Sequence, residues 1–222
     1  MLPVLPALAA LLPEGGLRRG AAVSVAGDTG LLLALAAGAS GLGEAGGAGV
    51  DVSATAGGEW VAAVGLPELG LGAAAGYGLD LRRLLLVDDP GGQWPEVVAT
   101  LAPAVGVILL RPDGPVSPQL ATRLTAVLRR GGCALLVAGP WPGAVLQLRL
   151  AAARWYGLGA GHGQLQGRQV EITAQGRGGA ARPRAARLWL PDEYGAARPF
   201  EPSDEFAPGF ERAAPSGRLA AV

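Results

Sequence analysis

The sequence predicts an α/β fold, in which a parallel sheet covered on both faces is extended by a C-terminal antiparallel meander. The first observation is that short apolar runs of strand length alternate with helical segments up to Pro140. These runs are apolar at successive positions, which is typical of parallel strands buried on both faces. The second observation is that the strand-like segments after Pro142 alternate apolar and polar residues, as antiparallel strands with one solvent face do.

The parallel part is expected to alternate strands and helices in the β-α-β order. Residues 118–130 form the clearest helix, because Ser117 can cap it, Leu120 and Leu124 share one face, and Gly131 can end it. The expected strands are 22–26, 60–64, 84–87, 105–110 and 134–138, and the expected helices are 31–37, 68–77, 94–101 and 118–130.

The antiparallel part is expected to contain strands near 145–155, 168–175 and 184–190. In "LQLRL" (146–150) the leucines point to one side, and "QVEITAQ" (169–175) and "RLWL" (187–190) repeat this period of two. The region is also basic, since residues 141–190 carry seven arginines and one acid, Glu171.

The domain organisation that we predict is a core over residues 1–190 followed by an acidic, disordered tail over 191–222. The tail has three arginines against six acids and no regular period. Within the core, the glycine- and alanine-rich stretch 38–59 is predicted to be a flexible insertion between the first helix and the second strand.

The N-terminal stretch "MLPVLPALAALLP" is predicted to be a buried helix of a cytoplasmic protein. Its apolar run is about eleven residues, well short of the ~20 that cross a bilayer. It also lacks the basic start of a secretory signal. We therefore expect no contact with a membrane.

The composition excludes several kinds of chemistry. All eighteen basic residues are arginine, so neither a lysine-dependent phosphate site nor Schiff-base chemistry is available. Cys133 is the only cysteine and His162 the only histidine, which leaves no disulfide framework, metal cluster or nucleophilic triad. Cys133 is expected to be a small buried residue and His162 a solvated residue of a glycine-rich turn. Asp88 and Asp89 end a strand, and we expect them to form a turn with a helix cap before Trp94. No catalytic residue, metal or cofactor is therefore expected.

One turn has the layout of a phosphate-binding loop. "VSVAGDTGLLLALAAG" (23–38) predicts a strand, a turn and an apolar helix, in that order. A P-loop needs a lysine followed by serine or threonine at positions 33 and 34, where this chain has Leu33 and Ala34. The turn Gly27, Asp28, Thr29 and Gly30 is therefore predicted to be a vestigial cofactor-binding site.

Over residues 12–190 the chain resembles the RecA-like ATPase core. The resemblance rests on "GGLRRGAAVSVAG", on "VGVILLR" (105–111) and on "VEITAQGRGGAARPRAARLWL" (170–190). It implies a P-loop core with degenerate Walker motifs, because Leu33 replaces the lysine and Arg111 stands at the Walker-B aspartate position. Magnesium-ATP needs both of those groups, so we expect no ATP hydrolysis. "GLPELGLG" lacks the usual acidic context, so Glu68 is not assigned the activating role.

More closely, the chain resembles actinobacterial ImuA-like proteins, which are short RecA-like accessory factors of the DNA-damage mutasome. The phrases that carry this resemblance are "LPEGGLRRG", "WVAAVGLPELGL", "WPGAVLQLRL", "RWYGLGAGHGQL" and "RPRAARLWLPD". It implies a non-catalytic adaptor in DNA-damage-induced (SOS) mutagenesis and translesion synthesis, which binds an ImuB-like Y-family polymerase homologue. RecA or an error-prone C-family polymerase complex are the further partners that it suggests. The alternative is a RecA-like nucleotide- or DNA-binding protein with residual ATP binding.

A basic and aromatic cluster is a candidate contact for single-stranded DNA. Arginine contacts phosphates and an aromatic ring stacks on bases. The alternative is a solvated face that keeps a lysine-free protein in solution. The cluster consists of Arg177, Arg182, Arg184, Arg187 and Trp189.

The aromatic residues of the acidic tail are candidate partner-binding residues. Phe200, Phe206 and Phe210 are spaced so that each can enter a separate pocket of a partner groove. For Phe200 and Tyr194, docking on their own domain is an equal alternative.

Overall fold

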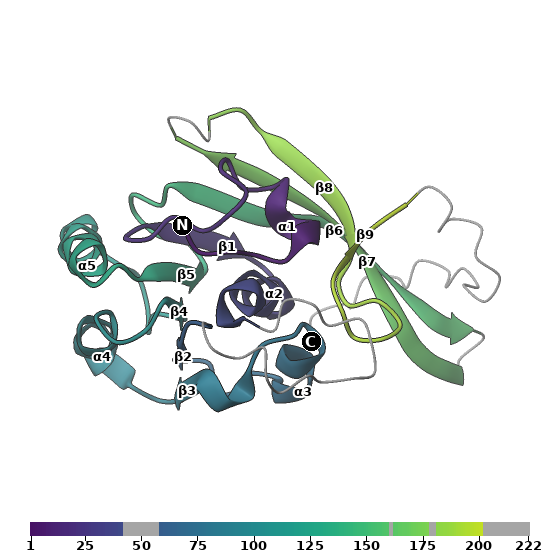
Figure 1. Ribbon diagram of the computed structural model, residues 1–222, viewed down its shortest axis with the longest axis horizontal. Helices are drawn as coiled ribbons and strands as arrows, with labels where there is room; N and C mark the ends of the chain where they lie inside the picture. The colour runs from purple at the N-terminus through teal and green to yellow at the C-terminus, as the bar shows by residue number, and fades with distance from the viewer. Residues whose placement is uncertain (42–57, 160–161, 178–180, 202–222) are drawn as a thin grey trace, which may run out of the picture.

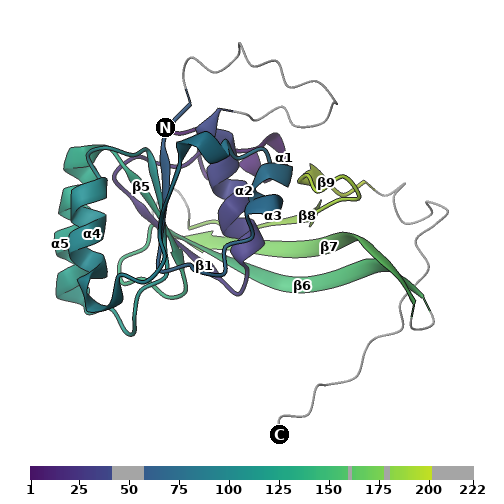
Figure 2. The same ribbon diagram turned by 90° about the horizontal axis from the view of Figure 1, so that it is seen from below.

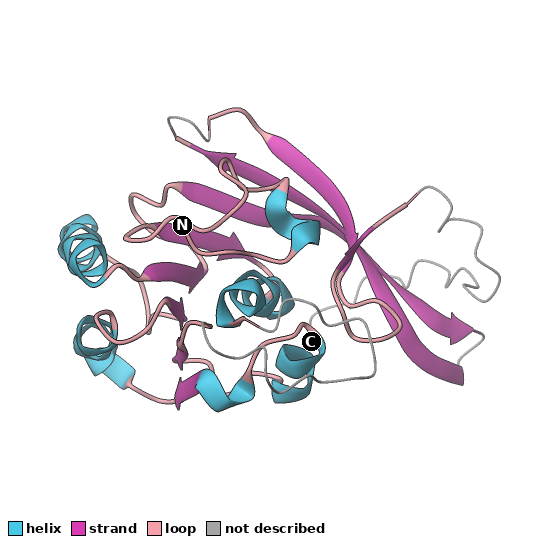
Figure 3. Cartoon of the chain, viewed as in Figure 1, coloured by secondary structure: helices cyan, strands magenta, loops and turns pink. Residues whose placement is uncertain are grey.

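The computed structural model describes residues 1–41, 58–159, 162–177 and 181–201, which form one mixed sheet with helices on both faces (Figure 1). The nine strands of these residues lie in the order β3-β2-β4-β5-β1-β6-β7-β8-β9. Figure 3 separates strands from helices by colour. The strands are β1 Ala22–Ala26, β2 Val61–Val64, β3 Leu84–Val87, β4 Val107–Leu110, β5 Ala134–Ala138, β6 Leu146–Gly159, β7 His162–Gly176, β8 Arg184–Trp189 and β9 Arg198–Pro199.

Helices cover the parallel part of the sheet on both sides. The α4 and α5 helices lie together on one face, and α1, α2 and α3 lie on the other (Figure 2). Each face has its own apolar core, one around α2 and one around Trp94, Val98 and Leu124. The helices are α1 Pro6–Ala9, α2 Thr29–Ser40, α3 Leu71–Gly76, α4 Trp94–Leu101 and α5 Pro118–Gly131, with 3-10 turns η2 Leu81–Arg83 and η3 Gly91–Gln93.

The sheet changes direction at β6. Strands β1 to β5 pair only in parallel, and β6 pairs in parallel with β1. The pairs β6–β7, β7–β8 and β8–β9 are antiparallel. The predicted mixed sheet, parallel first and antiparallel last, is thus confirmed. Its physical basis is confirmed for the central strands β2 and β4, which are buried at every position, but not for the edge strand β3, where no position is fully buried.

Most predicted elements are confirmed with shifted ends. The helix predicted at 31–37 extends over Thr29–Ser40, so residues 38–40 belong to α2 and not to a flexible insertion. The rest of that predicted insertion lies almost entirely outside the described residues. His162 starts β7, so its backbone lies in a strand and not in a turn. Neither Asp88 nor Asp89 caps α4, because its N-cap is Gln93 and no side chain bonds there. Cys133 is fully buried, as predicted, and burial raises its thiol pKa to about 12.

The boundary predicted at residue 190 is wrong. Residues 191–201 fold back onto the domain, and Arg198–Pro199 pairs with β8 as β9. Asp192 anchors this return, because its buried carboxylate accepts hydrogen bonds from the backbone nitrogens of Tyr194 (2.9 Å) and Ala196 (2.8 Å). A local carboxylate turn of this kind needs no apolar period, which explains why the pattern missed it. Residues 202–222 lie outside the described part.

The N-terminal segment packs across α2. Leu2 pairs with Leu17 in an isolated antiparallel bridge, and Leu8 and Leu11 are fully buried. The predicted buried N-terminal helix is therefore confirmed, but as the single turn α1. Among the residues that the structure describes, no helix has the length and apolarity that a membrane crossing requires.

Gly38 sets the distance between α2 and this segment. A Cβ atom there would lie 2.4 Å from the backbone of Val4, which is a clash with main-chain atoms. We expect Gly38→Ala to lower the free energy of unfolding by about 1–3 kcal/mol, because overpacking forces the segment away. Chemical denaturation measures this change.

Gly72 provides the matched control, since it is also helical but has no atom within 4 Å of the position that a Cβ atom would take. Gly72→Ala should leave stability unchanged or raise it, because alanine favours a helix by about 1 kcal/mol. Equal effects of the two substitutions would contradict the packing role of Gly38.

Candidate functional site

The carboxylate of Asp28, in the turn before α2, caps the N-terminus of that helix. Gly27 has φ +87°, and Asp28 is extended and serves as the N-cap of α2. The Oδ1 atom of Asp28 accepts a hydrogen bond from the backbone nitrogen of Leu31 at 2.7 Å. A helix N-terminus favours a negative charge, and here the chain supplies that charge itself.

Arg168 of β7 holds this carboxylate in a two-point ion pair. Its Nη1 donates to Asp28 Oδ2 at 2.6 Å, and its Nη2 donates to Asp28 Oδ1 at 3.0 Å. Its Nε donates to the carbonyl of Leu190 at 2.7 Å. The side chains of Arg168 and Asp28 are only 13% and 7% exposed. One guanidinium therefore joins the turn before α2, the strand β7 and the segment that follows β8.

Tyr77 completes the surroundings of this pair. It follows α3, is 3% exposed, and its pKa is raised to about 12, chiefly by burial. A Cβ atom on Gly30 would lie 3.1 Å from the Tyr77 hydroxyl and 3.1 Å from Asp28 Oδ1. The cluster of Asp28, Arg168 and Tyr77, which we call the α2 lock, thus leaves little room for a side chain at Gly30.

The α2 lock lies at the N-terminus of α2, and a helix N-terminus is where a P-loop binds phosphate. The amide of Leu31 already donates to a carboxylate, and a phosphate at this terminus would face that negative charge. The strand β1, the turn at Gly27 and Asp28, and the helix α2 thus follow one another in the predicted strand–turn–helix order. The anion at this helix terminus is the carboxylate of Asp28, which already caps the helix.

A second ion pair lies at the position that the RecA resemblance gives to the Walker-B aspartate. Arg111 follows β4, and its guanidinium donates to the carboxylate of Glu68, in the loop after β2. This hydrogen bond is the main cause of the lowered pKa of Glu68. Both side chains are partly exposed. In the described residues, no group of three or more acidic, histidine or cysteine side chains is suited to hold a metal ion.

The arginines of the predicted nucleic-acid cluster do not share one face. Arg184 pairs across the sheet with Ala174 on the α2 side, whereas Arg187 pairs with Glu171 on the opposite side. Arg187 also lies near Glu171 as an ion pair at 3.9 Å. Arg177 and Arg182 are exposed beside the turn between β7 and β8. A strand alternates its side chains, so arginines close in sequence are separated in space.

Trp189 is buried, which corrects its predicted role in base stacking. It is 1% exposed and contacts Tyr156 and Phe200, with ring centroids 5.1 and 5.9 Å apart. Arg198 lies over its ring at 5.4 Å. Phe200 therefore docks on its own domain, which was one of its two predicted alternatives. Phe206 and Phe210 lie outside the described residues.

Trp155 is an exposed aromatic residue of β6. It is 42% exposed, and the guanidinium of Arg168 lies 5.3 Å from its ring. Both backbone groups of Arg168 still bond to the segment after β8, at Leu190 and Pro191. Beyond it, β6 and β7 pair only with each other, so residues 156–159 and 162–167 form a two-stranded arm with Trp155 at its base. Figure 2 shows this arm projecting from the body of the domain.

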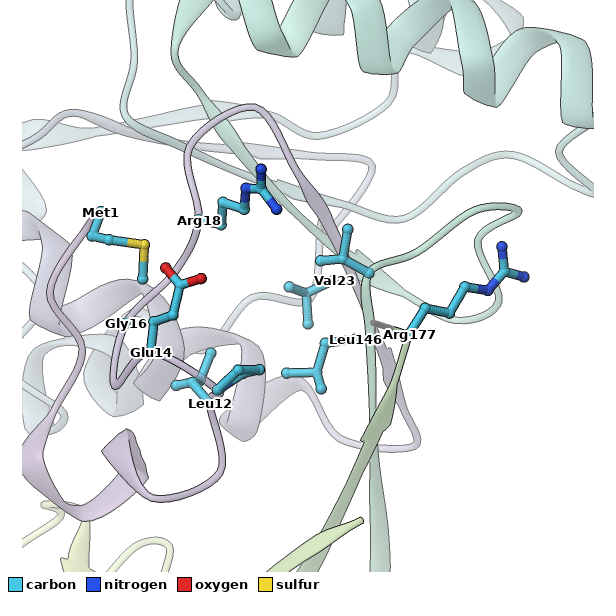
Figure 4. A pocket seen from close by; sticks show the side chains of 10 residues that line it. Met1, Leu12, Glu14, Gly16, Arg18, Val23, Leu146 and Arg177 are labelled. Atoms are coloured by element: carbon cyan, nitrogen blue, oxygen red, sulfur yellow. The ribbon is translucent and has the colours of Figure 1, made fainter. Parts of the chain in front are cut away.

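A small cavity of about 100 Å³ lies at the amino-terminal ends of β1 and β6 (Figure 4). Arg18, Arg177 and Glu14 surround an apolar floor that includes Leu12, Val23 and Leu146. The α2 lock lies at the other end of β1, beside the carboxyl ends of the parallel strands. Parallel sheets bind ligands at the carboxyl ends of their strands, so we assign this cavity no catalytic role.

The sequence analysis missed Arg168 and Tyr77. A signal for Arg168 was present, because it has the same parity as Val170, Ile172 and Ala174, which all face the core. A buried guanidinium requires a carboxylate. Nothing in the sequence pattern indicated which carboxylate, because Asp28 is 140 residues away.

The ion pair in the α2 lock should make a large contribution to stability. We expect Arg168→Met to lower the free energy of unfolding by about 3–5 kcal/mol, because it leaves a buried carboxylate without its partner. In an Asp28→Asn background, which keeps a capping side chain, the same change should cost much less. Urea denaturation of the four proteins measures this double-mutant cycle.

Arg111→Met is the matched control, because it breaks an arginine–carboxylate pair that is solvent-accessible. Its effect should be far smaller than that of Arg168→Met. Additive effects of Arg168→Met and Asp28→Asn would show that the two residues do not act as a pair.

Comparison with known proteins places this fold in a family. Residues 10–143 match the family described as the MT3502 N-terminal domain, a span that includes β1 to β5 and the turn before α2. The uncharacterized protein Rv3395c of Mycobacterium tuberculosis is 36% identical over 137 residues, which are 56% of this chain and 66% of the relative. The chain thus spans just under two thirds of that relative. Since the family match covers more than half of its residues, the chain belongs to the MT3502 N-terminal domain family.

Proposed function

We propose that this chain is an ImuA-like, RecA-type accessory protein that acts as a non-catalytic adaptor in DNA-damage-induced mutagenesis and translesion synthesis. The support is the order of the sequence motifs together with a parallel sheet that continues into an antiparallel meander. A mycobacterial relative agrees with the actinobacterial resemblance.

The observation that carries the non-catalytic part of the proposal is the α2 lock. An ATPase of the P-loop type needs free backbone amides, a cation at the β- and γ-phosphates and a carboxylate for magnesium. Here the Leu31 amide and the Arg168 guanidinium both bind Asp28. At the Walker-B position Arg111 offers a positive charge, and Glu68 is its partner. The amide and the charged side chains that would contact a nucleotide in an ATPase bind to other residues of this fold instead.

An adaptor must offer a surface to its partner, and in this proposal the partner is an ImuB-like polymerase homologue in a cytoplasmic complex. RecA or an error-prone C-family polymerase are further candidates. The two-stranded arm is suited to such a contact, because it stands apart from the core and exposes Leu165, with Trp155 exposed at its base. The tail aromatics Phe206 and Phe210 remain candidates for the same partner.

A second candidate is a RecA-like protein that binds nucleotide or single-stranded DNA. The observation in favour of a DNA contact is the exposed Trp155 at the base of the arm, since an exposed aromatic ring can stack on the bases of a single strand. Residual ATP binding is disfavoured by the carboxylate of Asp28 at the helix terminus.

One capture experiment separates the two candidates. We expect the full chain to capture a purified ImuB-like protein equally well with and without magnesium-ATP, because the α2 lock fills the phosphate position. A chain that ends at Glu201 shows whether residues 202–222 add to the contact. Absence of capture by the full chain would contradict the adaptor proposal, and capture that depends on magnesium-ATP would favour the second candidate.

A further inference from the structure

The edge strand β3 is apolar on both faces of the sheet. It pairs with β2 on one side, and no described residue pairs with it on the other. Leu85 and Leu86 are 37% and 45% exposed. Their neighbours in β2, Ala62 and Ala63, belong to the cores on opposite faces of the sheet, so the two leucines project to opposite faces. Edge strands of monomers usually carry a charge, a proline or a bulge that blocks further pairing, and Leu84–Val87 has none of these.

Charges of opposite sign flank this strand. The sequence of residues 82–89 is "RRLLLVDD", so arginines precede four apolar residues and aspartates follow them. Arg82 is held at its end of the strand by an ion pair with Asp80 at 3.0 Å. In an antiparallel pair of two such strands, each basic end lies beside the acidic end of the other. A parallel pair would place like charges together, which is unfavourable.

The backbone of β3 offers unused hydrogen-bonding groups at this edge. The carbonyl of Val87 accepts a bond from the Gly65 nitrogen at 2.9 Å, so Val87 and Leu85 direct their peptide groups towards β2. Leu84 and Leu86 alternate with them. The Leu84 N–H already donates to the Leu81 carbonyl, so the groups left at the free edge are the Leu84 carbonyl and the N–H and C=O groups of Leu86. In a two-fold antiparallel pair centred on Leu85, the Leu86 N–H of each copy would donate to the Leu84 carbonyl of the other. Centring the pair on Leu86 would place Leu84 opposite Asp88, so the first register is favoured.

We propose that β3 pairs with β3 of a second copy of this chain, so that two sheets join across a two-fold axis into one continuous sheet. The ladder covers Leu85 and Leu86 of both copies, and the flanking charges select the antiparallel direction. This interface lies at the opposite end of the sheet from the two-stranded arm (Figure 1). It therefore leaves the arm accessible, and the proposal does not depend on the adaptor role.

The test is the molar mass of the full chain in solution, measured by light scattering or sedimentation from micromolar to near-millimolar concentration. We expect a dimer whose dissociation constant rises at least tenfold in Leu86→Lys, because a charged side chain at the edge opposes pairing. Leu165→Lys is the matched control, since Leu165 is 54% exposed but lies on the arm. That variant should dimerise like the unaltered chain.

A second variant tests the charge pattern without changing an apolar residue. Asp88→Arg places a basic residue at both ends of β3, so it should also weaken the dimer and reverse part of the salt dependence. An unaltered chain that stays monomeric throughout would overturn the proposal. A dimer that survives both Leu86→Lys and Asp88→Arg, or one that only Leu165→Lys disrupts, would overturn it as well.

Discussion

The ion pair between Asp28 and Arg168 is the interaction on which the arrangement of this molecule depends. Asp28 belongs to the turn between the first strand and the first long helix, and Arg168 belongs to the meander. Through the Leu190 carbonyl, the same guanidinium also holds the segment after β8. The parallel and antiparallel parts of the sheet are therefore joined by the β1–β6 ladder and by this buried electrostatic contact. Because both charges are withdrawn from solvent, each is costly without the other.

The ion pair also explains how a phosphate-loop shape can exist without its ligand chemistry. A helix terminus with free amides attracts an anion, and in this chain the N-cap carboxylate is that anion. The Arg168 guanidinium then balances the negative charge of Asp28, as the lysine of a P-loop balances the charge of a phosphate. Arg111 and Glu68 form the equivalent internal pair at the end of β4.

The α/β class, the strand positions and the change from parallel to antiparallel pairing could be predicted from the sequence, because burial on one or two faces leaves a periodic pattern. The capping role of Ser117, whose hydroxyl accepts from the Leu120 nitrogen, was equally readable. The return of residues 191–201 was not, because it depends on Asp192 and on the contact of Trp189 with Phe200. The partner of Asp28 could not be predicted either, since nothing local specifies a contact across 140 residues. The arginines predicted to form a cluster do not share one face, because residues that are close in sequence alternate between the two faces of a strand.

The central claim is that Asp28 acts as a built-in anion at the start of α2, and anion binding by Asp28→Ser tests it most directly. Serine keeps a capping oxygen but removes the negative charge, which leaves Arg168 and the helix terminus facing an empty anion position. Thermal unfolding is followed while inorganic phosphate is added to the unaltered chain and to the variant. The account predicts that phosphate raises the melting temperature of Asp28→Ser and has little effect on the unaltered chain. Equal stabilisation of both proteins, or of neither, would contradict it.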